Sequence, residues 1–246
     1  PESRTAPANL AAVAEKLQTK GHELLVVTGF PNHPHGQIYE GYQQKVWQWD
    51  DVGGVRVLRL PLYPDHSPSL LRRGLNAGSF MVTASTIGLW KSRKFQPDVI
   101  FAYYAPQTMG VVAAIMRRFH GAPVVYWVTD LWIENLRAAE VSVSGSAYKA
   151  MGGLERWGHG QAAAICVASP GHKSKLEENG VPSERIFIVP EWADERLYYP
   201  VEPDPELAQR YGLANRFNVI YGGNLGVVQG LDTVIEAAKT LGDIED

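Results

Sequence analysis

Cysteine is almost absent from this sequence, because Cys166 is the only one in 246 residues. A lone cysteine excludes an internal disulfide framework and is typical of proteins that work in a reducing compartment such as the cytoplasm. Cys166 lies in the apolar run AAAICVAS, which predicts a buried, unreactive thiol rather than a nucleophile.

Long hydrophobic runs are also lacking. No apolar stretch reaches the roughly 18 to 20 residues that a membrane-spanning helix needs, and no signal peptide is visible. The first residue is Pro1 rather than a methionine, so we expect the natural start of the chain to lie upstream. The sequence therefore predicts no membrane span.

An excess of basic residues is missing too. The chain has 23 Lys and Arg against 26 Asp and Glu, for a formal net charge of −3, whereas dedicated nucleic-acid binders carry a basic excess. With 45% hydrophobic and 20% charged residues, the composition is that of a folded globular protein. We expect no nucleic-acid partner.

The sequence does contain a regular alternation of helical and apolar segments. Periodicity predicts helices over 8–20, 69–94, 107–121, 147–161 and 170–180, and short apolar runs predict strands over 22–29, 55–62, 97–106, 122–130, 163–169 and 185–190. Helices between apolar strands imply parallel pairing with right-handed crossovers. The fold class is therefore α/β, with an open, doubly wound, Rossmann-like parallel sheet.

The alternation stops at 191–216, where prolines and carboxylates predict a surface connector with one short helix. Beyond it, FNVIYGG predicts a strand and the segment from Gly230 a helix. We expect a first domain over 1–196, a linker over 197–216 and the first βα unit of a second Rossmann-like domain over 217–246. One βα unit cannot bury its own apolar face, so it either packs on the first domain or belongs to a domain that continues elsewhere.

Six stretches, taken together and in order, carry a resemblance: PESRTAP, KGHELLVVTGFPNHPHGQIYEGY, QPDVIFAYYAP, VVYWVTDLW, VASPGHKSKLEENGVPSERIFIVPEWAD and YGGNLGVVQGL. They resemble the family 4 glycosyltransferases of the GT-B fold. The likeness is greatest to bacterial enzymes of cell-surface polysaccharide assembly, of the colanic-acid and N-acetylfucosamine transferase type. It covers essentially the whole chain, and the order of the stretches is the specific signal.

The resemblance implies two Rossmann-like domains that face each other, with the donor nucleotide held mainly by the second. It also implies a first domain without its opening strand, and a Glu-x7-Glu donor-binding motif downstream of residue 246. This fragment alone is therefore expected to be inactive. Glu191 departs from the related PNW pattern, which has Asn at this place.

The activity that the resemblance implies is retaining glycosyl transfer. A sugar would move from a nucleoside diphosphate, UDP rather than GDP, to a hydroxyl of a lipid-linked or polysaccharide acceptor in cell-envelope glycan synthesis. No metal or other cofactor is expected, and the expected location is the cytoplasm, at the inner face of the plasma membrane. Two alternatives stay open: a nucleotide-sugar epimerase of GT-B architecture and a non-catalytic nucleotide-sugar-binding module.

Asp130 is the candidate catalytic residue. Ligands of open α/β sheets sit outside the carboxyl ends of the strands, and Asp130 follows the apolar run VVYWV, between Trp127 and Trp132. A carboxylate there can orient the acceptor hydroxyl or accept its proton, and we expect it to be desolvated or hydrogen-bonded. The alternative is that Asp130 only caps the next helix.

The expected donor-binding residues lie mostly in one glycine-rich loop. Its glycines suit a backbone that approaches a diphosphate closely, at the N-terminus of a helix. Relatives carry Arg and Lys in this loop, where this chain has Asn and Gln, and a residue before the first helix is expected near the phosphates by resemblance. The set is Gly222, Gly223, Asn224, Gly226, Gln229 and Arg4. The alternative is a tight turn without a ligand.

The loop GFPNHPHG is a candidate acceptor site. Two prolines stiffen it, and it places two histidines after a strand. The expected acceptor-binding residues are His33, His35, Tyr39, Tyr104 and Trp132. An inert rigid loop is the alternative, and a metal site is not expected because no third ligand is near the histidine pair.

Basic and apolar residues alternate in the segment 70–95. Such a mixture can dock on an anionic membrane surface, as a lipid-linked acceptor would require. The expected membrane contacts are Arg72, Arg73, Trp90, Lys91 and Arg93. The alternative is an ordinary amphipathic helix that covers the sheet.

Overall fold

The computed structural model describes residues 7–67, 69–138, 144–193, 195, 198–215, 217–223, 225–226 and 229–241. The chain divides into two compact units. Unit 1 comprises residues 1–133 and 143–191, and unit 2 comprises residues 134–142 and 192–246. Each unit is described by itself.

Unit 1 contains a three-stranded sheet in the order β1-β3-β2. Helix α1 (Pro7–Thr19) precedes β1 (Leu25–Gly29), and β2 (Gln48–Val52) is joined to β3 (Val55–Leu60) by a tight turn. β1 and β3 are parallel, with Val27 opposite Leu58, whereas β2 and β3 are antiparallel. β3 is buried on both faces, as expected for the middle strand of a covered sheet.

The second sheet of unit 1 is fully parallel, in the order β4-β5-β6-β7. Its strands are β4 (Ile100–Tyr103), β5 (Val124–Val128), β6 (Ala164–Val167) and β7 (Ile186–Ile188). Between them come α4 (Met109–His120), α5 (Trp132–Ala138), α6 (Gly145–Gly160), α7 (Pro170–Glu178) and the short 3-10 helix η2 (Ser183–Arg185). The predicted α/β class with parallel strands is confirmed.

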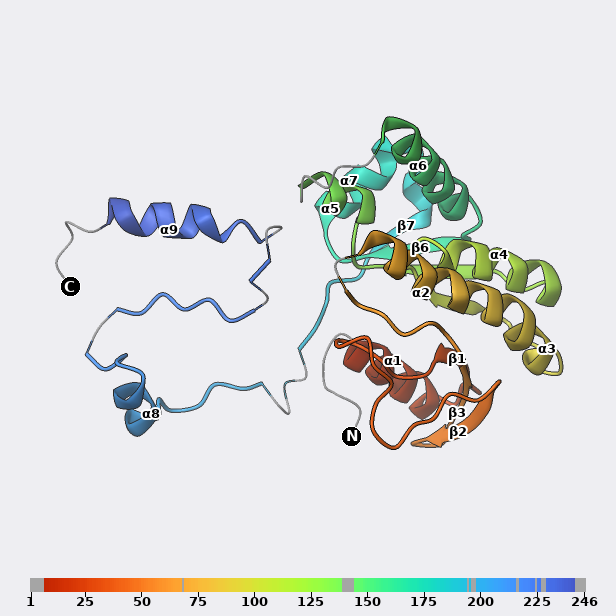
Figure 1. The fold of residues 1–246 in the computed structure, drawn as a ribbon, viewed down its shortest axis with the longest axis horizontal. Coiled ribbons are helices and arrows are strands. Elements are labelled where there is room, and N and C mark those ends of the chain that lie inside the picture. Colours follow the sequence, from red (N-terminus) through yellow and green to blue (C-terminus); the bar gives the residue numbers. More distant parts are fainter. Residues whose placement is uncertain are drawn as a thin grey trace. The chain divides into compact units, whose positions relative to one another are not determined.

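A single helical rod connects the two sheets (Figure 1). It consists of α2 (Leu70–Thr83), the π-helical turn η1 (Ala84–Gly88) and α3 (Leu89–Ser92). The rod and α4 share a core with Leu58 and Leu60 of β3, against which Val27 of β1 and Ile100 of β4 also pack. β1 and β4 therefore both pack against this core. Among the described residues, each of them has a strand neighbour on one side only.

The main core of unit 1 fills the parallel sheet. Val124, Tyr126 and Val128 of β5 pack with Ile165 of β6 and Leu176 of α7. These strands read as continuous apolar runs in the sequence because helices cover the sheet and alternation with polar residues is not needed.

One strand of unit 1 was not predicted from the sequence. Strand β2 has the sequence QWDDV, whose polar residues gave no strand signal. Strand β2 depends on its pairing with β3 rather than on local periodicity. Helix α5 begins at Trp132, two residues after Asp130, as in the alternative in which a helix follows Asp130.

Unit 2 corrects one prediction. Helices α8 (Pro205–Arg210) and α9 (Leu231–Thr240) form as expected. The predicted strand over 217–223 does not form, and Phe217, Val219 and Ile220 are strongly exposed. A strand needs a neighbour to pair with and a layer to cover it, and the described residues of unit 2 supply neither.

Candidate functional site

A chain of hydroxyl groups leads to Asp130 at the carboxyl edge of the parallel sheet. β4 and β5 are parallel neighbours, so both Tyr103 and Thr129 lie at this edge. The Tyr103 hydroxyl is 2.9 Å from Thr129 Oγ1, which donates a hydrogen bond to Asp130 Oδ2 at 3.4 Å. Because the only hydroxyl hydrogen of Thr129 points to Asp130, Tyr103 is the donor to Thr129.

The carboxylates around Tyr103 change its acidity. Burial raises the pKa of the Tyr103 hydroxyl, the hydrogen bond with Thr129 lowers it, and the negative charges of Asp130 and Glu191 raise it further. Tyr103 therefore stays protonated at neutral pH and keeps its role as a hydrogen-bond donor. Two carboxylates and one phenol thus gather where the strands β4, β5 and β7 end.

Asp130 itself is exposed. Of the two expected conditions, desolvation or a hydrogen bond, the structure shows the hydrogen bond. Of the two flanking tryptophans, Trp127 is buried and Trp132 is half-buried. An exposed carboxylate at a strand end is open to an incoming ligand. Its role in catalysis stays a prediction.

Tyr104 cannot contact an acceptor, and this prediction is wrong. The residue is buried in the main core, where its ring packs 4.7 Å from Tyr126 and 4.9 Å from His159, measured between centroids. Successive side chains at a strand end point to opposite faces. Tyr103 therefore lies beside Thr129 at the edge of the sheet, while Tyr104 enters the core.

The loop after β1 lies against the loop after β3. His33 and His66 make an edge-to-face contact at 5.2 Å between ring centroids, and His66 Nε2 is 2.8 Å from Asn32 Oδ1. The Tyr39 hydroxyl donates to the carbonyl of His33. His33 and His35 are exposed and Tyr39 is half-buried, so the two histidines are accessible as predicted. His66 was missed, because its position next to His33 depends on the pairing of β1 with β3.

Burial lowers the pKa of His66, and the positive charges of His33 and Arg73 lower it further, while Asp65 opposes them. At neutral pH the ring is therefore uncharged and can donate or accept a hydrogen bond. This chemistry suits the hydroxyl groups of a sugar.

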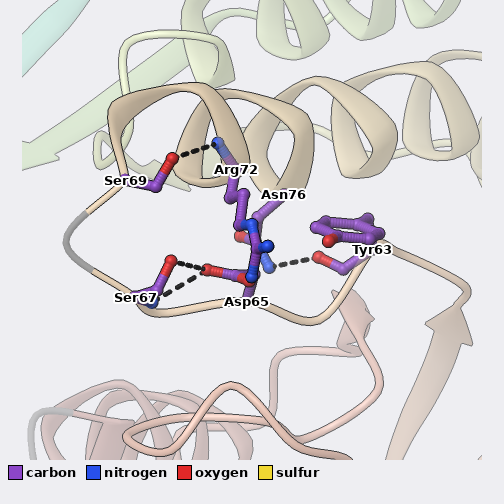
Figure 2. A network of polar contacts seen from close by, with 6 residues as sticks. All are labelled: Tyr63, Asp65, Ser67, Ser69, Arg72 and Asn76. Carbon is purple, nitrogen blue, oxygen red and sulfur yellow. Dashed lines mark hydrogen bonds and ion pairs between the residues drawn. The ribbon is translucent and has the colours of Figure 1, made fainter.

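Figure 2 shows how the loop after β3, which contains Asp65 and Ser67, is joined to the start of α2. Asp65 accepts hydrogen bonds from the amide and the hydroxyl of Ser67 and lies 3.7 Å from Arg72. Ser69 caps α2 through the amide of Arg72, and the Asn76 side chain donates to the carbonyl of Tyr63. The hydrogen bonds of Ser67 lower the pKa of Asp65, with Arg72 as a smaller cause. These contacts tie the loop after β3 to the start of α2, and His66 of the same loop lies against His33.

The glycine-rich segment lies in unit 2. Gly222, Gly223 and Gly226 precede Gln229, whose amide donates to the carbonyl of Gly226. Gly230 has a left-handed backbone and leads into α9. A Cβ atom at Gly222 would meet no neighbour, so the backbone there is open to a ligand. Asn224 and Arg4 lie outside the described residues.

The predicted membrane contacts fall at the two ends of the helical rod. Arg72 and Arg73 lie in the first turn of α2, and Trp90 and Lys91 lie in α3 with Arg93 just after it. All are exposed except Lys91, which is half-buried. Trp47, which precedes β2, completes the second group, because Lys91 Nζ lies 3.4 Å from the centroid of its ring.

Comparisons with known proteins identify the family of the chain. Residues 7–192 match the model of the glycosyl transferase 4-like domain. Over 238 residues, or 94% of its length, the chain is 30% identical to the putative colanic acid biosynthesis glycosyl transferase WcaI of Escherichia coli (strain K12). It spans 58% of the length of that relative. The chain therefore belongs to the glycosyl transferase 4-like family.

Proposed function

We propose that the whole protein is a retaining glycosyltransferase of cell-envelope polysaccharide synthesis. It moves a sugar from a nucleoside diphosphate, UDP rather than GDP, to a hydroxyl of a lipid-linked or polysaccharide acceptor. Family membership supports the reaction class, and the relative named for colanic acid biosynthesis supports the kind of product. The observation that carries the assignment to residues is the hydrogen-bonded group of Tyr103, Thr129 and Asp130.

In this proposal Asp130 positions the acceptor hydroxyl. The Tyr103–Thr129 hydrogen bonds fix one carboxylate oxygen, so that the other can accept the proton of the acceptor hydroxyl or hold it by a hydrogen bond. The backbone around Gly222–Gly226 approaches the donor diphosphate, and α9 directs its N-terminus to the charge. The protein then acts mainly by positioning groups and by stabilising the charge of the leaving diphosphate.

The substitution Asp130→Asn in the full-length protein tests the role of the carboxylate. It keeps the shape of the side chain but removes its charge, and we expect kcat to fall by about 100-fold or more while the nucleotide-sugar still binds. Asp98→Asn is the matched control, since Asp98 is exposed and precedes β4 rather than following it. Unchanged turnover in Asp130→Asn would contradict the assignment.

The donor and the cofactor requirement are tested in the same assay. Saturation-transfer NMR with UDP, GDP and their sugars identifies the nucleotide, and we expect UDP to give the strongest signal. We also propose that transfer needs no metal, so turnover should persist in EDTA. The anomeric configuration of the product decides whether transfer retains stereochemistry.

A nucleotide-sugar epimerase is the second candidate. Such an enzyme needs acid and base groups at the sugar, and the pair Asp130 and Glu191 around Tyr103 is the observation that favours it. Inversion at C2 of the sugar without transfer would establish the epimerase. Nucleotide binding without transfer or inversion would instead indicate a binding module.

We further propose that the protein works at the inner face of the plasma membrane as a peripheral protein. A lipid-linked acceptor keeps its reactive sugar close to the bilayer, so an enzyme that uses it must approach that surface. No helix among the described residues is long and apolar enough to cross a membrane.

A further inference from the structure

The inner face of the helical rod is occupied by the core. Ala84 and Gly88 of η1 and Ser92 of α3 are buried. A Cβ atom at Gly88 would lie 3.1 Å from Leu60 and 3.3 Å from Val27, so this side of the rod touches both β3 and β1. The rod therefore has a fixed orientation, and its opposite side is the outer surface of unit 1.

That outer side carries a stripe of exposed apolar side chains, which we call the rod stripe: Leu71, Leu75, Val82 and Trp90. Their exposed fractions are 75%, 52%, 56% and 51%. A soluble helix normally turns such residues inward. Here the inward side is already filled by other residues, so the rod is apolar on two sides.

The π-helical turn keeps Trp90 in the stripe. Each residue of an α-helix turns the chain by about 100°, which would place Trp90 about 100° away from Leu71 around an unbroken helix. In η1 the amide of Leu89 donates to the carbonyl of Ala84, five residues back. This turn takes up one additional residue and brings Trp90 back to the side of Leu71.

The charge of the rod has one sign. Between Ser69 and Phe95 the sequence contains three arginines and two lysines and no aspartate or glutamate. The whole chain, in contrast, has a net charge of −3. The positive charge is therefore concentrated at the two ends of the rod, and only the cations Lys91, Arg93 and Lys94 follow the stripe at its Trp90 end.

Two tryptophans and two cations lie together at one end of the rod stripe. Trp47 and Trp90 meet edge to face at 6.0 Å between ring centroids. Lys91 Nζ lies 3.4 Å from the Trp47 ring and 4.1 Å from the Trp90 ring, and the Arg93 guanidinium is 5.0 Å from the latter. Both indole rings are nevertheless exposed, and tryptophan beside lysine or arginine is typical of side chains at the headgroup level of a bilayer.

We propose that the rod stripe, with Trp47 and the cations beside it, docks on an anionic lipid bilayer. The rod would lie flat, with Leu71, Leu75 and Val82 in the outer acyl region and the cations at the lipid phosphates. A second copy bound through the same face is disfavoured because the cations Lys91, Arg93 and Lys94 of one copy would meet like charges of the other. This inference rests on the membrane association proposed above and names the surface responsible.

Docking in this orientation has a consequence for the acceptor. The loop with Asp65 and His66 leads directly into α2 and contacts the loop with His33. Both loops are thus held at one end of the docked rod. A lipid-linked sugar would meet them without leaving the bilayer surface.

Vesicle co-sedimentation of the chain tests the surface without any sugar nucleotide. We expect binding to vesicles of equal parts phosphatidylcholine and phosphatidylglycerol, weak binding to phosphatidylcholine alone, and release by high salt. The double variant Lys91→Glu/Arg93→Glu should weaken binding by about 30-fold, and Leu75→Ser/Trp90→Ser by about tenfold. Circular dichroism verifies that each variant is folded.

Two controls match these changes on other elements. Lys173→Glu/Lys175→Glu makes the same charge change on α7, and Trp157→Ser removes an exposed tryptophan from α6. We expect both to bind vesicles as the unchanged chain does. Equal losses in the rod and control variants, or equal binding to neutral vesicles, would overturn the proposal. The proposal would also be overturned if the chain formed a dimer in solution that only the rod variants dissociate, and if those variants still bound vesicles.

Failure of this test differs from failure of the transferase assignment. Vesicle binding by the chain without turnover by the full-length protein would leave the surface intact and refute the reaction. Turnover with a water-soluble acceptor and no vesicle binding would do the reverse.

Discussion

Three polar side chains meet inside unit 1 without hydrogen-bond partners among the described residues. They are Tyr104, Tyr126 and His159, and their hydroxyl oxygens and both ring nitrogens are buried. Such groups normally find a partner, because each unpaired one lowers stability. Burial raises the pKa of both tyrosines, so their hydroxyls remain neutral. This cluster makes the core sensitive to pH and to small changes in volume.

The pH dependence follows from His159. Burial lowers the pKa of its ring to about 4, from an ordinary 6.5. In the unfolded chain the ring takes up a proton as the pH falls through 6.5, whereas the folded ring does not until about pH 4. The free energy of unfolding should therefore decrease between these pH values, by about 3 kcal/mol in total.

Urea unfolding at several pH values measures this decrease. His159→Phe removes the titrating group and retains an aromatic ring of similar size, so its stability should fall less steeply over the same range. Identical slopes for the two proteins would show that His159 is not the group responsible.

The close contact of α6 with Tyr104 gives a second prediction. A Cβ atom at Gly158 would overlap the Tyr104 hydroxyl, whereas one at Gly153 on the same helix would meet nothing. Gly158→Ala should therefore destabilise unit 1 by about 1 to 3 kcal/mol, and Gly153→Ala should stabilise it by up to about 1 kcal/mol. Thermal unfolding distinguishes the two. Tyr104→Phe should partly rescue Gly158→Ala, and no rescue would contradict the contact.

At the scale of elements, β2 shows why local sequence was insufficient. Its partner is β3, and the buried Arg59 of β3 donates to Asp50 of β2 at 2.5 Å. The Arg59 guanidinium also lies over the Tyr42 ring, at 5.0 Å from its centroid. Burial acts to raise the pKa of Asp50, but hydrogen bonds from Gln48 and Arg59 lower it overall. The polar residues of QWDDV gave no strand signal, yet one of them, Asp50, joins β2 to β3 through its ion pair with Arg59.

Removing one charge of this pair should be costly. Asp50→Asn removes the charge of the carboxylate that accepts from the buried Arg59, and we expect the free energy of unfolding to fall by about 3 kcal/mol. Replacing both partners, as in Asp50→Leu/Arg59→Leu, should cost less than the single change because no uncompensated charge remains. Chemical denaturation compares the variants, and a larger loss in the double variant would contradict the pairing.

The regular elements of unit 1 were predictable because continuous apolar runs and helical periodicity are local signals. Which residues enter the site was less predictable. Asp130 could be predicted from the rule that ligands sit at strand ends. Whether Tyr103 or Tyr104 lies beside it depends on which face of the sheet each residue at the end of β4 points to. His66 and Glu191 reach their neighbours only through the pairing of strands distant in sequence. The predicted strand over 217–223 does not form for the opposite reason. Its residues have the local pattern of a strand, but no strand among the described residues pairs with them.

At the scale of the whole molecule, β1 and β4 each have one side without a strand neighbour among the described residues. Such rows of free amides and carbonyls are templates for any extended peptide. Both rows border one shared core, so a single inserted peptide could bond to each and merge the two sheets. Concentrated preparations of the chain should accordingly be handled as a protein prone to self-association through its backbone.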